Sequence, residues 1–146
     1  MLKTLGAVVL GYAAIIAFTM ISMTLAWFGT GPDFAFIEGT VDTSTGWALL
    51  SVLLGFLAGM FGGWSASFVK FEAVRILAVV VLLLGAVSIF LEQPPMELDK
   101  PIAELGVMEA ATYAVQPIWY KYVIPVIGFL GVVIGGGLRR RPATHA

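Results

Sequence analysis

Cysteine and asparagine are absent from this 146-residue chain, and histidine occurs once, at His145. Without cysteine there is no disulfide, thiol nucleophile or thiolate metal site. Without asparagine there is no acceptor for N-glycosylation. One histidine cannot supply two axial ligands to a haem, and so near the end of the sequence it lacks the rigid surroundings that a catalytic base needs. We therefore expect no cofactor, no metal site and no catalytic residue.

Charge is scarce as well. Only 12% of the residues are charged and 60% are hydrophobic, with a mean hydropathy of +0.98. A soluble domain has roughly 25% charged residues, so this chain lacks the polar surface that faces water. The net charge of −1 gives no reason to expect a nucleic-acid partner. The composition predicts an integral membrane protein whose immediate partner is the lipid bilayer.

Four apolar stretches are long enough to cross that bilayer. Residues 46–69 carry no charge over 24 positions, about 36 Å of helix against a hydrocarbon core of about 30 Å. The first stretch, 4–28, exceeds the apolar region of a signal peptide, so we expect an uncleaved helix. The others are 73–91 and 118–138. They predict an all-α bundle of four transmembrane helices in two hairpins, one domain over 1–146, with external loops 29–45 and 92–117.

The second loop contains its own periodic pattern. Pro101 is followed by Ile102, Leu105 and Met108 at roughly helical spacing. Proline is favoured in the first turn of a helix, and the apolar spacing marks one face. We expect a helix of about 12 residues here, lying on the membrane surface.

The charges predict the orientation. Six basic residues flank the side that holds both termini and the turn at residues 70–72, whereas eight acids lie in the two long loops. Cytoplasmic loops of membrane proteins carry the excess of lysine and arginine. We therefore expect both termini in the cytoplasm. The basic residues on that side are Lys3, Lys70, Arg75, Arg139, Arg140 and Arg141.

Two of the spans carry glycine at regular spacing. Gly55, Gly59 and Gly63 form two overlapping GxxxG motifs, which place a flat stripe on one helix face. Another backbone can approach such a stripe closely, within one chain or between copies. The last span has a second small-residue face, and we expect the two spans to be partners. Its glycines are Gly128, Gly131 and Gly135.

The spans contain no ionisable residue away from their ends, and such residues are the usual mark of transport or proton relay. Hydroxyl side chains are the main polar groups inside them. Most such hydroxyls bond to a carbonyl of a neighbouring backbone, although a small polar pocket is the alternative. The candidates for that pocket are Thr19, Ser22, Ser51 and Ser65.

The external acids do not form a recognisable cation site. Asp33, Glu38 and Asp42 lack the tight alternation around a glycine that an EF-hand needs. If the two external loops fold over one another, their acids form an acidic cap that would suit a basic partner.

The absences also exclude several four-helix families. Quinone-linked disulfide oxidoreductases need cysteines, bis-histidine cytochromes b need intramembrane histidines, and small multidrug exporters need a glutamate in the first span. Residues 59–75, GMFGGWSASFVKFEAVR, and 116–141, QPIWYKYVIPVIGFLGVVIGGGLRRR, instead resemble small bacterial four-helix membrane proteins of unassigned biochemistry. The resemblance implies a location in the bacterial inner membrane and brings no activity.

These observations favour a non-enzymatic membrane protein, either an accessory subunit of a larger complex or a self-associating scaffold. Its partners would be other membrane subunits or further copies of the chain. The alternative is a small transporter or channel for a neutral or apolar solute, which needs only a path lined by hydroxyl groups. An enzyme would have to use external carboxylates alone, and we do not expect one.

Overall fold

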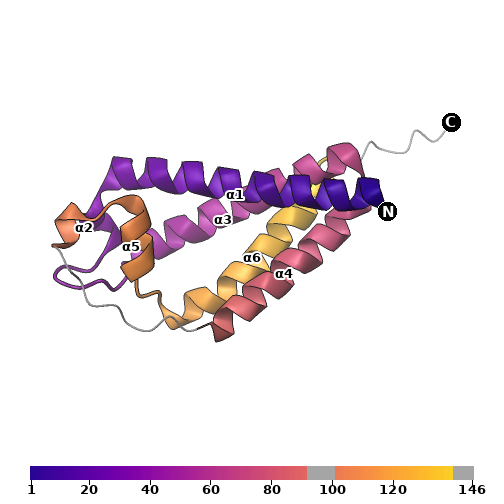
Figure 1. Cartoon of the computed structure of the whole chain (residues 1–146). Helices are drawn as coiled ribbons and strands as arrows, with labels where there is room; N and C mark the ends of the chain where they lie inside the picture. Colours follow the sequence, from indigo (N-terminus) through magenta and orange to yellow (C-terminus); the bar gives the residue numbers. More distant parts are fainter. Residues whose placement is uncertain (92–100, 140–146) are drawn as a thin grey trace.

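The computed structural model describes residues 1–91 and 101–139, and every long element in these two ranges is a helix (Figure 1). Four helices are long and apolar enough to cross a membrane, which confirms the predicted all-α bundle. They are α1 (Leu2–Thr30), α3 (Thr45–Val69), α4 (Ala73–Phe90) and α6 (Ile118–Gly137); the short elements are α2 (Pro32–Ala35), the 3-10 turn η1 (Ile102–Glu104) and α5 (Val107–Tyr113).

Several residues used above lie outside the described ranges. The part of the second loop at 92–100 does, and so do the last residues of the chain, 140–146. The acids at 92, 97 and 99, the arginines at 140 and 141 and the histidine at 145 belong to these segments.

Consecutive long helices run in opposite directions, so α3 and α6, the second and fourth, run parallel (Figure 1). The hairpins α1–α3 and α4–α6 join mainly through an extensive contact between α3 and α6. The turn at 70–72 connects α3 to α4, yet these two helices contact each other little, and α6 lies in the angle between them. We call the end with this turn and the N-terminus the turn end, and the opposite end the loop end.

The core of the bundle sits toward the turn end, where all four long helices meet. Leu77 and Val132 are its largest fully buried side chains, packed with Ala66, Val74 and Ala78. Small and medium apolar residues let the helices approach closely where no hydrophobic effect drives them together inside a bilayer. This cluster therefore holds the two hairpins in register.

Helix α3 begins at a side-chain cap. The Ser44 hydroxyl oxygen accepts a hydrogen bond from the Trp47 amide at 3.1 Å, as an N-cap serine does. The same hydroxyl donates to the carbonyl oxygen of Phe34. Ser44 therefore starts α3 and ties it to the end of α2.

The prediction of one 12-residue surface helix in the second loop is wrong. The chain forms η1, then breaks at Leu105 and Gly106 and starts again as α5. Leu105 is drawn into an apolar cluster, and the Gly106 amide donates to the Glu109 carboxylate at 2.9 Å, which caps the new helix. Burial of Leu105 thus divides the predicted helix in two.

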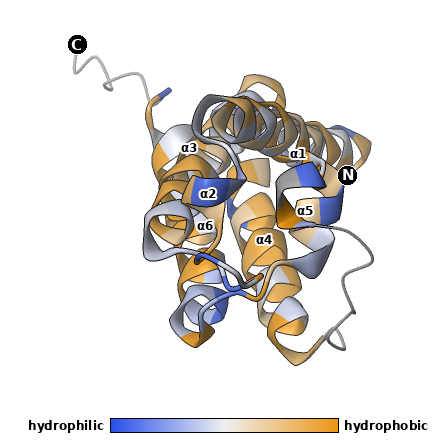
Figure 2. Ribbon diagram, turned by 90° about the vertical axis from the view of Figure 1, so that its left-hand side faces the viewer, coloured by the Kyte–Doolittle hydropathy of each residue, from blue (hydrophilic) through white to orange (hydrophobic). Residues whose placement is uncertain are grey.

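The two loops fold over one another at the loop end. The Thr43 amide donates to the Val115 carbonyl at 2.9 Å, and the Val115 amide donates to the Val41 carbonyl at 3.0 Å. We call residues 31–44 and 101–116 the cap. Figure 2 looks onto it and shows hydrophilic residues on α2 and α5 above the apolar helices. Its described acids, all exposed, are Asp33, Glu38, Asp42, Glu104 and Glu109.

Candidate functional site

Glycines allow the backbones of α3 and α6 to meet at the centre of their contact. A Cβ atom on Gly59 would lie 2.8 Å from the carbonyl oxygen of Gly128, and one on Gly131 would lie 2.5 Å from the carbonyl oxygen of Phe56. Real Cβ atoms do not approach so closely, so the two backbones touch directly. The two helices therefore meet backbone to backbone along this line.

The glycines predicted to pack differ in the helices that they contact. Gly59, Gly63, Gly131 and Gly135 all lie in the α3–α6 contact. Gly128 also faces α4, because its Cβ would lie 3.0 Å from Val81.

Gly55 lies at the margin of this contact. Its Cβ would lie 3.7 Å from Ile124, an ordinary van der Waals distance. Gly55 therefore differs from Gly59 and Gly63 despite the regular spacing of the motif, because only Gly55 has room for a methyl group.

Sequence reasoning missed a second glycine contact, between α1 and α3. A Cβ on Gly62 would lie 2.8 Å from the Gly11 carbonyl oxygen, and one on Gly11 would lie 2.9 Å from Ala66. The adjacent pair Gly62 and Gly63 could have indicated this contact, because neighbouring residues point about 100° apart around a helix. Such a pair serves two different neighbours, here α1 and α6.

The α4–α6 contact has its own close approaches. A Cβ on Gly85 would lie 2.8 Å from the ring of Pro125, and one on Gly136 would overlap Val74. Pro125 is buried inside α6. Each of the three main helix pairs therefore depends on at least one glycine.

The four hydroxyl residues named for a polar pocket make mostly local contacts. Ser22 Oγ donates to the Thr19 carbonyl in its own helix at 3.2 Å, and Ser65 Oγ donates to the Phe61 carbonyl at 2.8 Å. These are ordinary bonds of a serine back to the preceding turn. Ser51 differs, because its side chain is turned toward α1 and α6 instead.

Ser51 lies at the floor of a cavity beneath the cap. It is 4% exposed, its hydroxyl is 3.9 Å from the sulfur of Met23, and it interacts with the side chain of Tyr120. The cavity has a volume of about 130 Å³. Gln116 also lines it, so three polar groups face an otherwise apolar space.

Aromatic side chains form the walls of this cavity. Trp27 packs edge-on against Trp47 with ring centroids 5.9 Å apart, and against Phe36 at 6.1 Å. Ala110, on α5, also lines the cavity, and its small side chain leaves the space open. An apolar cavity of about 150 Å³ binds a benzene-sized molecule, so this one suits a small ring with one hydrogen-bonding group.

The turn end carries fixed positive charge. Arg139 donates to the Ser67 carbonyl at 3.2 Å, and its guanidinium lies 3.9 Å from the centroid of the Phe68 ring. Lys70 pairs with Glu72 at 2.8 Å, and this contact lowers the pKa of that fully exposed carboxyl group. Arg139 therefore neutralises the negative end of the α3 dipole.

In the described part of the chain, no group of three or more His, Asp and Glu side chains comes together that could hold a metal ion.

Comparison of the chain with protein-family models, with curated proteins and with solved structures found no match.

Proposed function

We propose that this chain is a non-enzymatic multi-pass protein of the bacterial inner membrane that serves as an accessory or scaffold subunit of a larger membrane complex. The direct backbone contact between α3 and α6 supports this proposal most strongly. At this contact the backbones of the two helices meet without a side chain between them. A rigid bundle of this kind presents fixed outer surfaces to a partner.

The glycine faces serve helices of the same chain. Gly59 and Gly63 of α3 already meet α6, and Gly62 already meets α1. A second copy would therefore have to dock on another surface. This favours association with a different protein over self-association through the GxxxG motifs.

An exposed row of aromatic side chains on α3 provides one such surface. Trp64 and Phe68 pack edge-on at 4.5 Å, and Phe61 lies one turn before them. All three remain exposed on the outside of the bundle. Aromatic side chains supply much of the binding energy at protein interfaces.

The proposed orientation places both termini in the cytoplasm. Lys3, Lys70, Arg75 and Arg139 all lie at the turn end, and the described acids of the cap lie at the other. The positive-inside rule supports a cytoplasmic turn end and an external cap.

The first test is the composition of the native particle. The chain is extracted from its own membrane in a mild detergent, its particle mass is compared with the 15.6 kDa of one chain, and co-purifying proteins are identified. A stable particle with other proteins is expected, and its loss in Trp64→Ala but not in Leu83→Ala, on α4, would locate the interface. A lone monomer or a homo-oligomer would contradict the proposal.

The second candidate is a binding or transport function for a small neutral or apolar solute, favoured by the cavity beneath the cap. Benzyl alcohol is a suitable probe, read through tryptophan emission. Under this alternative the response saturates, disappears in Ala110→Leu, which fills the cavity, and persists in Ala17→Leu on the outer face of α1. A response that never saturates, and is equal in all three proteins, would exclude it.

A further inference from the structure

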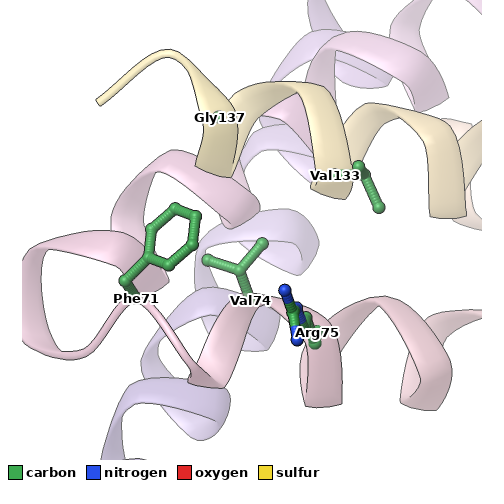
Figure 3. A pocket seen from close by; sticks show the side chains of 5 residues that line it. All are labelled: Phe71, Val74, Arg75, Val133 and Gly137. Atoms are coloured by element: carbon green, nitrogen blue, oxygen red, sulfur yellow. The ribbon is translucent and has the colours of Figure 1, made fainter. Parts of the chain in front are cut away.

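A groove opens between α4 and α6 at the turn end (Figure 3). Its volume is about 410 Å³, within the range of small-molecule sites. Figure 3 shows Phe71, in the turn before α4, and Val74, at the start of α4, pointing toward α6, with Val133 pointing back across the gap. Gly137 completes the lining, and a Cβ on it would meet nothing within 4 Å. Four of the five described lining residues are apolar.

Arg75 is the single charged residue among the described residues that line this groove. Among the described residues it makes no hydrogen bond or ion pair. Its nearest carboxylate, Glu72, feels its charge but is bonded directly to Lys70 at 2.8 Å. Arg139, the other described arginine at this end, is already held by Ser67 and Phe68. Arg75 therefore has a guanidinium available for an external anion.

The place of the groove identifies the kind of anion. Arg75 lies in the first turn of a membrane-spanning helix, so its guanidinium sits at the depth of lipid headgroups. The exposed side chain of Val133 lies farther into the span and faces the acyl region. A guanidinium binds phosphate oxygens in pairs. Basic pockets between transmembrane helices bind phospholipid headgroups. A soluble anion would gain nothing from the exposed side chain of Val133.

We propose that this groove is a specific site for one anionic glycerophospholipid, with its phosphate on Arg75 and an acyl chain against Val133. The site does not depend on the proposed subunit function. Its contact with the chain joins α4 to α6 at their turn ends, where Gly136 rests on Val74. A bound lipid would therefore also hold these two helices together.

Native mass spectrometry of the full chain, released from detergent with equal amounts of phosphatidylglycerol and phosphatidylcholine, tests the site. We expect one phosphatidylglycerol retained per chain. Arg75→Gln should reduce its retention about fivefold, the factor for one basic residue at a membrane surface. Lys3→Gln removes the same charge at the same end but away from the groove, and it should leave retention unchanged.

A second variant tests the groove without changing its charge. Gly137→Leu has room at its Cβ, so the chain should fold, and the leucine should narrow the groove beside Arg75 and lower retention despite an intact Arg75. Equal losses in Lys3→Gln and Arg75→Gln would overturn the proposal in favour of general surface charge. Wild-type retention in either Arg75→Gln or Gly137→Leu would also overturn it. Displacement of the lipid by millimolar inorganic phosphate would assign Arg75 to a soluble anion instead.

Discussion

The carbonyl oxygen of Met60 occupies the place where a side chain on Gly135 would have to begin. No rotamer can relieve this overlap, because the Cβ atom itself and a backbone carbonyl are the two groups involved. The fit between α3 and α6 is therefore set by main-chain atoms, and any residue larger than glycine must push the helices apart.

Gly135→Ala should lower the free energy of unfolding by about 1–3 kcal/mol, the usual cost of overpacking a tight contact. Titration with a denaturing detergent, followed by circular dichroism, measures the loss. Gly137→Ala is the matched control, since it lies two residues away with open space around its Cβ. Equal stability of the two variants would show that the α3–α6 contact is looser than described.

Gly62→Ala should weaken the α1–α3 contact by a similar amount, about 1–3 kcal/mol, because its Cβ would meet Ile15 and the Gly11 carbonyl. Gly55→Ala is the control on the same helix. It should be tolerated, since its nearest neighbour is at 3.7 Å. Cysteine pairs placed across α1 and α3 in this cysteine-free chain would report the change in separation. The hypothesis fails if Gly55→Ala is the more damaging of the two.

Trp27→Ala should destabilise the cap, because Trp27 is only 8% exposed and touches both Trp47 and Phe36. Replacing a buried tryptophan by alanine costs about 3–5 kcal/mol. Protease sensitivity of the two loops, compared with that of the more exposed Trp119→Ala, measures the effect. Cleavage at wild-type rates in Trp27→Ala would mean that the loops hold together without this residue.

Arg139→Gln should loosen the last turn of α3 by about 1 kcal/mol, through loss of the hydrogen bond to Ser67 and the contact with the Phe68 ring. Hydrogen exchange of the amides near the end of α3 is the direct readout. Arg75→Gln removes the same charge without these contacts, so it should leave exchange there unchanged. Faster exchange in both variants would assign the effect to charge alone.

Glu72 gives the pH dependence expected of the turn at 70–72. Lys70 holds the pKa of its carboxyl group below the ordinary value. The resulting stabilisation is present above the unfolded-state pKa and is lost as the pH falls through the lower, folded-state value. The effect should be small, because an exposed pair is well screened. Thermal melts of wild type and Glu72→Gln should converge at acid pH; a constant difference at all pH values would exclude the ion pair as its cause.

The four long helices could be predicted because their signal is purely compositional. An uncharged run of 24 residues has one structural outcome in a bilayer, and the turn at 70–72 is marked by Lys70 and Glu72 themselves. The break in the expected surface helix could not be predicted, because it depends on Leu105 being buried by Trp27 of α1 and Phe36 of the first loop. Local periodicity contains no information about that partner.

The candidate site could be predicted only in part from the sequence. Glycine spacing predicted the packing faces of α3 and α6. Only the structure distinguishes Gly59, which is in direct backbone contact, from Gly55, which has room for a side chain. The cavity beneath the cap combines Ser51 with Gln116 and Tyr120 from distant segments. Ser51 has no sequence feature that distinguishes it from Ser65, which merely bonds to its own helix.

The pairing of α3 with α6 has a consequence for how the chain is made. Its two halves are the second and fourth spans to leave the ribosome, and α4 and the second loop are synthesised between them. Until α6 is inserted, the bare backbone at Gly59 and Gly63 faces lipid or an insertion factor. The bundle is therefore completed by its last helix, and a nascent chain stalled before residue 118 would be the form most dependent on a membrane chaperone.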